Sequence, residues 1–251
     1  MAQLFRENLR RQELLLGTLV TLPCASIAEI LSDSGFDWLF FDMEHAPFGL
    51  SDVQSMLQAT STEVAGLVRV PANDEVWVKR VLDLGADGII VPQVMTRADA
   101  QRAVLAARYP PQGRRGVGVA RAQRYGARLA DYLATANDQI ATVIQIEHID
   151  AVRAVDDIVT VDGVDAVLIG PFDLSGSLGK LGRIHDDDVR EAIATVHAAC
   201  QRHGITSGIF VPTAAEAVPY IEQGFRLVTV GVDTILLGQA ARGIVGTLRE
   251  Q

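Results

Sequence analysis

Eight short runs rich in aliphatic and β-branched residues recur along the chain, and segments with helical periodicity separate them. Apolar residues are nearly continuous within each run, which is typical of strands in a parallel sheet covered on both faces. The pattern therefore predicts eight βα units, with strands over Leu15–Leu22, Trp38–Met43, Ala65–Val70, Gly88–Val94, Ala141–Glu147, Ala166–Asp173, Thr206–Val211 and Leu227–Asp233.

Eight βα units in 251 residues predict an α/β fold of the (β/α)₈ TIM-barrel type, with a closed parallel sheet and one domain over residues 1–251. A doubly wound open sheet is the alternative. The barrel is favoured because no G-x-G-x-x-G turn follows the first strand, and because eight strands are what closure needs.

Capping residues and glycines mark where the helices begin and end. Ser51-Asp52 and Thr213 are typical of helix starts, and Gly85, Gly204 and Gly224 are typical of helix ends. The segment between the fourth and fifth strands contains YPPQGRRGVGVARAQRYG and is too long for a plain connector. We expect this insertion on the face where the strands end, as a lid or an interface, with an idle surface loop as the alternative.

The composition of the chain limits the classes of binding partner that are expected. A net charge of −9 argues against nucleic acid and against a polybasic membrane anchor, so the expected ligand is a small molecule, which local arginines could still bind as an anion. No apolar run reaches the length of a membrane span, and the N-terminus lacks the pattern of an export signal. Cys24 and Cys200 show no metal or disulfide spacing. A cytoplasmic protein with reduced cysteines is expected.

Polar residues gather where the predicted strands end, which is where a barrel of this type carries its active site. They are Asp42 and His45 after the second strand, Arg69 on the third, Gln93 on the fourth, Gln145 and Glu147 on the fifth, Asp173 on the sixth and Asp233 after the eighth. Burying so many polar groups is costly unless each finds a partner. A shared site would supply those partners.

Glu147 and Asp173 end adjacent predicted strands, so their carboxylates would repel each other unless a cation or a proton lay between them. Hard oxygen ligands without clustered histidine or cysteine favour Mg²⁺ or Mn²⁺, with Co²⁺ tolerated. The alternative for Asp173 is a cap on the next helix. His148 is left out, because neighbouring side chains on a strand point to opposite faces.

Arg69 would lie across from the metal and donate to the carbonyl or enolate oxygen of a substrate, or else form a salt bridge with a core carboxylate. The backbone of Gly170, Pro171, Phe172 and Asp173 could bind the substrate carboxylate at a helix N-terminus, although proline has no N–H to donate.

Two lysines, Lys79 and Lys180, occur in the chain, and neither falls on a predicted strand. A Schiff-base mechanism, which needs a desolvated lysine, is therefore not expected. No serine or cysteine stands in a nucleophile elbow either. His45 lies three residues beyond Asp42, and we expect the carboxylate to fix the tautomer of the imidazole, which then acts as the base.

Seven stretches carry a resemblance to a known family: FDMEHAPF, LVRVP, LDLGADGIIVPQV, YPPQGRRGVG, QIE, IGPFDLSGSLG and VGVDTILL. With these stretches, the chain resembles over nearly its whole length the metal-dependent class II pyruvate aldolases of the HpcH/HpaI family, the 4-hydroxy-2-oxo-heptanedioate aldolases. The resemblance implies that Glu147 and Asp173 bind the metal and that Arg69 binds the pyruvyl oxygen. It also implies that His45 and Asp42 handle protons and that Gln145 lies near the bound oxo acid.

The resemblance further implies a hexamer, built as a trimer of dimers that exchange their C-terminal helix, with the catalytic residue Asp83 reaching a neighbouring subunit's site. Phe210 and Val211 end the seventh strand in a stretch where smaller aliphatic residues are usual in the family. Both are expected to bind substrate, and Phe210 would narrow the aldehyde pocket.

The resulting hypothesis is a carbon–carbon lyase that reversibly cleaves 4-hydroxy-2-oxo acids to pyruvate, or a related 2-oxo acid, and an aldehyde through a metal-stabilised enolate. Three alternatives stay open on the same scaffold: an oxaloacetate decarboxylase, a CoA-thioester lyase and a barrel that binds oxo acids without catalysis. The natural aldehyde is also left open.

Overall fold

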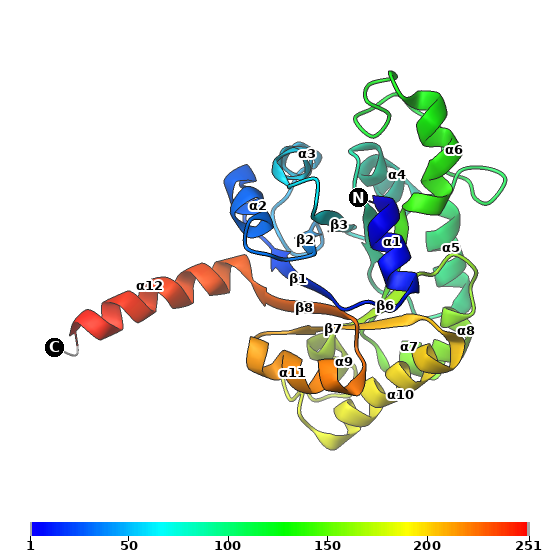
Figure 1. The fold of residues 1–251 in the computed structure, drawn as a ribbon. Helices are drawn as coiled ribbons and strands as arrows, with labels where there is room; N and C mark the ends of the chain where they lie inside the picture. The colour runs from blue at the N-terminus through cyan, green and yellow to red at the C-terminus, as the bar shows by residue number, and fades with distance from the viewer. Residues whose placement is uncertain (1, 250–251) are drawn as a thin grey trace.

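Eight parallel strands close into a barrel in chain order (Figure 1). The structure is a computed structural model that describes residues 2–249. Its strands are β1 (Leu15–Val20), β2 (Trp38–Asp42), β3 (Ala65–Arg69), β4 (Gly88–Val91), β5 (Ala141–Ile146), β6 (Ala166–Ile169), β7 (Thr206–Val211) and β8 (Leu227–Val232). Pairing of β8 with β1 closes the sheet, so the predicted (β/α)₈ barrel is confirmed and the open sheet is wrong.

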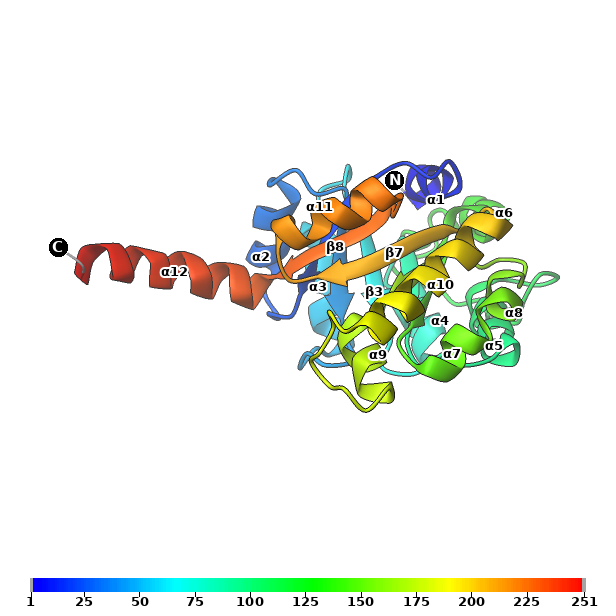
Figure 2. The ribbon, with the colours of Figure 1, turned by 90° about the horizontal axis from the view of Figure 1, so that it is seen from below.

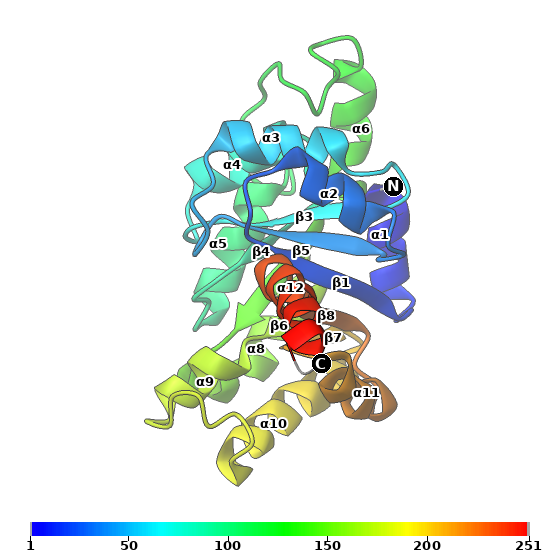
Figure 3. The ribbon, with the colours of Figure 1, turned by 90° about the vertical axis from the view of Figure 1, so that its left-hand side faces the viewer.

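Helices alternate with the strands and cover the outside of the barrel, as Figure 2 shows from below. They are α1 (Ala2–Arg10), α2 (Ala25–Ser32), α3 (Leu50–Ala59), α4 (Glu75–Asp83), α5 (Arg97–Ala107), α6 (Leu129–Gln139), α7 (Ile149–Arg153), α8 (Val155–Val159), α9 (Pro171–Ser177), α10 (Asp187–His203), α11 (Ala214–Gln223) and α12 (Asp233–Arg249). In contrast to the others, α12 extends away from the barrel (Figures 1 and 3).

Every strand begins at the residue that the apolar pattern predicts, but most strands end earlier. The largest difference is in β6, which stops at Ile169, because Pro171 occupies the first turn of α9 and cannot donate a ladder hydrogen bond. Asp173 therefore lies on the first turn of α9 rather than on the strand.

The predicted helix signals mostly hold. Thr213 caps α11 by accepting a hydrogen bond from the backbone N–H of Glu216, and Gly224 ends that helix with a φ of 105°. Gly85 and Gly204 also follow their helices in the left-handed conformation. For α3 the cap differs from the prediction: Gly49 is the N-cap, and Asp52 accepts its backbone N–H at 2.8 Å.

Two apolar clusters hold the barrel together. One fills its interior and includes Trp38, Phe40 and Leu67, and the other packs the outer strand faces against the helices. A side chain at Gly17 on β1 would collide with the fully buried Trp38 ring, so glycine is needed there. Burial of this apolar surface is the main favourable term in folding.

The insertion between β4 and β5 lies at the end of the barrel where the strands begin. Helices α3 and α4 run antiparallel to the strands, and the Arg121 guanidinium donates to the carbonyls of Leu57 and Leu84 near their C-terminal ends, at 3.1 and 2.7 Å. The expectation that the insertion sits on the face where the strands end is wrong, and it is not a lid over this chain's own site. Its role as an interface stays a prediction.

A buried ion network joins α1 to the start of β5 and β6. The Asp165 carboxylate accepts hydrogen bonds from Arg6 Nε at 2.7 Å, from Arg108 Nη2 at 3.3 Å and from the Thr142 backbone at 2.9 Å. Burial, aided by the nearby charge of Arg6, lowers the pKa of Arg108 to about 10. One carboxylate therefore compensates two buried guanidinium groups.

We expect Asp165→Ala to lower the free energy of unfolding by about 3–5 kcal/mol, because Arg6 and Arg108 would be left buried without their anion. Urea denaturation at a fixed protein concentration measures the change. The control is Asp156→Ala, which removes an exposed pair with Arg202 and should leave the midpoint near the wild-type value. Equal midpoints for Asp165→Ala and the wild-type protein would contradict the role given to the network.

Within residues 2–249, none of the helices is long and apolar enough to cross a membrane.

Candidate active site

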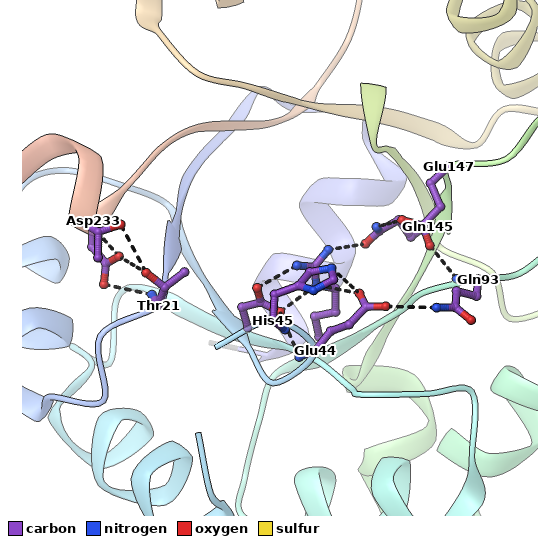
Figure 4. Close-up of polar contacts among 10 residues, drawn as sticks. Thr21, Glu44, His45, Gln93, Gln145, Glu147 and Asp233 are labelled. Atoms are coloured by element: carbon purple, nitrogen blue, oxygen red, sulfur yellow. Dashed lines mark hydrogen bonds and ion pairs between the residues drawn. The ribbon is translucent and has the colours of Figure 1, made fainter. Parts of the chain in front are cut away.

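A pocket of about 150 Å³ opens where the strands end. Its walls combine apolar side chains of the barrel interior with polar residues that follow the strands, as Figure 4 shows for part of the set. The lining residues are Leu19, Phe40, His45, Arg69, Gln145, Leu168, Ile169, Gly170, Pro171, Phe172, Asp173 and Phe210. The structure thus brings together most of the predicted site residues.

Arg69, the last residue of β3, is the fixed cation of this pocket. Its Nε and Nη2 atoms donate to the two oxygens of Asp42 on β2, at 2.8 and 2.7 Å, and its Nη1 donates to Gln145 Oε1 at 3.3 Å. The guanidinium also lies 5.1 Å from the centre of the Phe40 ring. Burial opposes its charge, but the hydrogen bonds and charge of Asp42, with Glu44 and Glu147, raise the pKa of Arg69.

The imidazole of His45 has a different neighbour from the one predicted. Asp42 uses both carboxylate oxygens for Arg69 and also accepts the backbone N–H groups of Glu44 and His45, at 3.0 and 3.3 Å. The His45 side chain, 66% exposed, instead places Nε2 at 3.7 Å from Glu44 Oε2. Asp42 therefore positions the backbone of His45, and Glu44 takes the place beside the ring.

Glu147 follows β5 and is held from two sides (Figure 4). Its Oε1 accepts the backbone N–H of Gln93 at 2.8 Å, and its Oε2 accepts a hydrogen bond from the Gln145 side-chain amide. Gln93 can point this N–H at the carboxylate because it adopts a left-handed conformation, with a φ of 55°, which is strained for a residue with a side chain.

Asp173 lines the same pocket from the first turn of α9, where its carboxylate is exposed. Gly170, the N-cap of α9, lies directly against Glu147: a Cβ built there would be 3.3 Å from Glu147 Cβ and 3.5 Å from its Oε2. Glycine at this position therefore leaves room for the Glu147 carboxylate at the pocket wall.

The charges around the pocket suit a cation. Four carboxylates, those of Asp42, Glu44, Glu147 and Asp173, surround one guanidinium and one imidazole. Glu147 and Asp173 offer the hard oxygen ligands that Mg²⁺ and Mn²⁺ prefer. In residues 2–249 no three histidine, cysteine or acidic side chains are close enough together to hold a metal ion by themselves.

Phe210 and Val211 point to opposite sides of β7. Phe210 lines the pocket, whereas Val211 is buried in the cluster between the strands and the helices and does not line it. This difference follows from the alternation of side chains along a strand. Both residues, with Pro171, also line a neighbouring groove between α10 and α11. Contact of Val211 with substrate stays a prediction.

Two other residues that the sequence analysis named, Asp83 and Asp233, do not line the pocket, and neither does His148, which was left out of the predicted site. Asp83 ends α4 and accepts a hydrogen bond from the buried Arg115 at 2.8 Å, so any role in a neighbouring subunit's site stays a prediction. His148 caps α7 through its Nδ1. Asp233 begins α12 and accepts hydrogen bonds from the backbone and hydroxyl of Thr21, across the barrel mouth in Figure 4.

Comparison with known proteins agrees with this geometry. The family model described as HpcH/HpaI aldolase/citrate lyase matches residues 17–240. The chain belongs to the HpcH/HpaI aldolase/citrate lyase family. It is 37% identical to the 5-keto-4-deoxy-D-glucarate aldolase of Escherichia coli O6:H1 over 248 residues, which cover 98% of this chain and 96% of that protein. Family membership makes it a carbon–carbon lyase.

Solved HpcH/HpaI structures share the fold. A family protein from Burkholderia cenocepacia superposes with a TM-score of 0.95 at 41% identity, covering 98% of this chain and 99% of that chain. The HpcH/HpaI aldolase from Desulfitobacterium hafniense gives a TM-score of 0.89 at 32% identity, covering 98% and 96%. The resemblance inferred from the sequence motifs is therefore confirmed.

The predicted site did not include two residues that lie beside this HpcH/HpaI pocket, Glu44 and Gln93. Glu44 stands between Asp42 and His45 in FDMEHAPF, and the sequence could have indicated it as a second carboxylate beside the histidine. Gln93 was expected at a strand end without a role, and its left-handed backbone carries no signal in the sequence. Gln93 Nε2 lies 3.5 Å from Glu44 Oε1, so this residue spans the space between Glu44 and Glu147 (Figure 4).

Proposed function

We propose that the chain reversibly cleaves 4-hydroxy-2-oxo acids to pyruvate, or a related 2-oxo acid, and an aldehyde. The observation that carries the proposal is a small pocket lined by Arg69, Gln145, His45 and Asp173, with Glu147 hydrogen-bonded to Gln145 beside it. The 37% identical relative named as a 5-keto-4-deoxy-D-glucarate aldolase supports this class of substrate.

Glu147 and Asp173 would hold a divalent cation, Mg²⁺, Mn²⁺ or Co²⁺. Their hard oxygen donors, the excess of negative charge and the space left by Gly170 fit such an ion. When bound, the ion supplies Lewis acidity toward the substrate ketone.

The remaining residues bind and orient the substrate. Arg69, held in place by Asp42, donates to the oxygen on which negative charge develops. Gln145 and the α9 start, with Pro171 and Phe172, contact the oxo acid, and Phe210 narrows the opposite wall, where the aldehyde would leave. His45 takes the proton of the C4 hydroxyl as the C3–C4 bond breaks, directly or through water.

A Schiff-base route finds no support in this pocket, because no lysine lines it in the described part of the chain. Lys180 pairs with Asp186 and Asp188, at 3.3 and 2.6 Å, outside the pocket. Borohydride should therefore trap no substrate on the protein. Covalent trapping would overturn the proposed mechanism.

A pyruvate-release screen over 4-hydroxy-2-oxo acids tests the function. We expect release with Mg²⁺, Mn²⁺ or Co²⁺, loss with EDTA and recovery when the metal is restored. Oxaloacetate and CoA thioesters run beside these substrates separate the decarboxylase and thioester-lyase alternatives. If the protein bound oxo acids but released no product, the non-catalytic alternative would remain and the proposed aldol cleavage would be wrong.

The assembly is also part of the proposal: a hexamer as a trimer of dimers, in which α12 is exchanged and Asp83 reaches a neighbouring site. Leu237, Ile244 and Leu248 recur on one face of α12 and are 60%, 65% and 67% exposed in the single chain. An apolar stripe on a helix that leaves the barrel favours burial against another subunit. The cytoplasmic location stays a prediction.

We expect the double substitution Leu237→Asp with Leu248→Asp to dissociate the assembly, because each charge would be buried in the interface. Sedimentation velocity measures the change in mass. The control is Leu181→Asp, which alters an exposed residue outside α12 and should leave the sedimentation coefficient unchanged. A double variant that sediments like the wild-type protein would contradict an interface on this face.

A further inference from the structure

Glu44 carries a buried carboxylate oxygen without a hydrogen-bond donor. Its side chain is 9% exposed, and within residues 2–249 no group donates a hydrogen bond to Oε2, because Arg69 Nε lies close to it but is not aligned with it. Burial raises the pKa of Glu44, an effect that Arg69 opposes and that the negative charges of Glu147 and Asp42 reinforce. A desolvated oxygen of this kind is costly unless another group uses it.

Neutralisation of the Arg69 charge does not explain why the Glu44 carboxylate is buried. Asp42 already forms the two-bonded pair with that guanidinium, whereas Glu44 Oε2 lies 3.3 Å from Arg69 Nε and makes no hydrogen bond to it. The other group that faces Oε2 is the His45 imidazole, with Nε2 at 3.7 Å. Because the His45 side chain is largely exposed, a shift of less than about 1 Å would close this distance to a hydrogen bond.

We propose that Glu44 is the positioning residue of His45: its Oε2 accepts the Nε2–H of the imidazole and leaves Nδ1 as the nitrogen that takes the substrate proton. The Glu44 side chain is placed for this task by Arg69 on one oxygen and by the Gln93 amide, 3.5 Å from the other. Asp42 does not take this place: its oxygens bind Arg69, and in the described residues the carboxylate paired with the His45 ring is that of Glu44. The inference rests on the proposed function for its kinetic consequence, but not for its geometry.

The geometry can be tested without catalysis. Solid-state NMR of protein labelled with ¹⁵N-histidine, at a pH where free imidazole is neutral, reports which ring nitrogen carries the proton. We expect His45, assigned by its loss in His45→Ala, to be protonated at Nε2, and its Nε2 resonance to move in Glu44→Gln but not in Glu63→Gln. A His45 protonated at Nδ1, or an Nε2 resonance that ignores Glu44→Gln, would overturn the proposal whatever reaction the protein catalyses.

The kinetic arm uses the same variants. Glu44→Gln should lower kcat for cleavage about 10- to 100-fold with KM changed less than about twofold, while Mn²⁺ binding by calorimetry stays near the wild-type value. In the His45→Ala background, Glu44→Gln should cost nothing further, because the two residues act as one unit. A Glu44→Gln enzyme with wild-type kcat, or full additivity in the double variant, would overturn the proposal. A wild-type protein without aldolase activity would contradict only the proposed function, because the NMR experiment tests the position of Glu44 independently of catalysis.

Discussion

Glu147→Gln should abolish binding of the divalent cation and with it most of the activity. The substitution keeps the size of the side chain, and the remaining oxygen can still accept the Gln93 N–H, but the charge and one hard oxygen ligand are lost. Loss of the ion removes several kcal/mol of stabilisation, so we expect cleavage to slow on the order of 10³-fold. Calorimetric titration with Mn²⁺ and the pyruvate-release assay measure the two effects.

Glu63→Gln is the matched control, because Glu63 is exposed and lies just before the start of β3, at the opposite end of that strand from Arg69. It should bind Mn²⁺ and release pyruvate like the wild-type protein. If Glu147→Gln kept wild-type Mn²⁺ affinity, the carboxylate after β5 would not be a ligand, and the proposed metal site would have to move elsewhere.

The barrel could be predicted because its strands are buried on both faces. Such strands are continuous apolar runs, and all eight starting residues agree with the structure. Strand ends were less predictable: the apolar run of β6 continues past Ile169, but the chain turns at Gly170 into the helix that begins at Pro171. An apolar run shows which residues are buried, and the buried residues continue past the last hydrogen-bonded residue of the strand.

The site could be located because polar residues at strand ends stand out against apolar strands. Arg69, Gln145 and Glu147 meet as expected, since β3 and β5 both flank β4 in the closed sheet. Pairings between side chains were less predictable. Asp42 and His45 are close in sequence, but the bidentate geometry of Arg69 occupies the Asp42 carboxylate and leaves Glu44 beside the ring.

Two features depend on information that a single sequence does not carry. The insertion was assigned to the wrong end of the barrel, because the length and composition of a loop do not show at which end it lies. Gln93 owes its contact with Glu147 to a strained left-handed backbone that its residue type does not favour.

His45→Ala should slow cleavage about 10²- to 10⁴-fold while leaving binding of pyruvate nearly intact, the range typical of a lost proton-transfer group. Binding is expected to survive because Arg69 is held by Asp42 and Gln145, and Glu147 by Gln93 and Gln145, none of which depends on the imidazole. Steady-state kinetics and pyruvate titration by calorimetry separate the two effects.

The matched control is His203→Ala, which removes an imidazole paired with Asp156 on the outer surface and should leave both quantities unchanged. A His45→Ala enzyme with the wild-type rate would show that proton transfer belongs to another group, and Glu44, the carboxylate that now stands beside the ring, would be the first to examine.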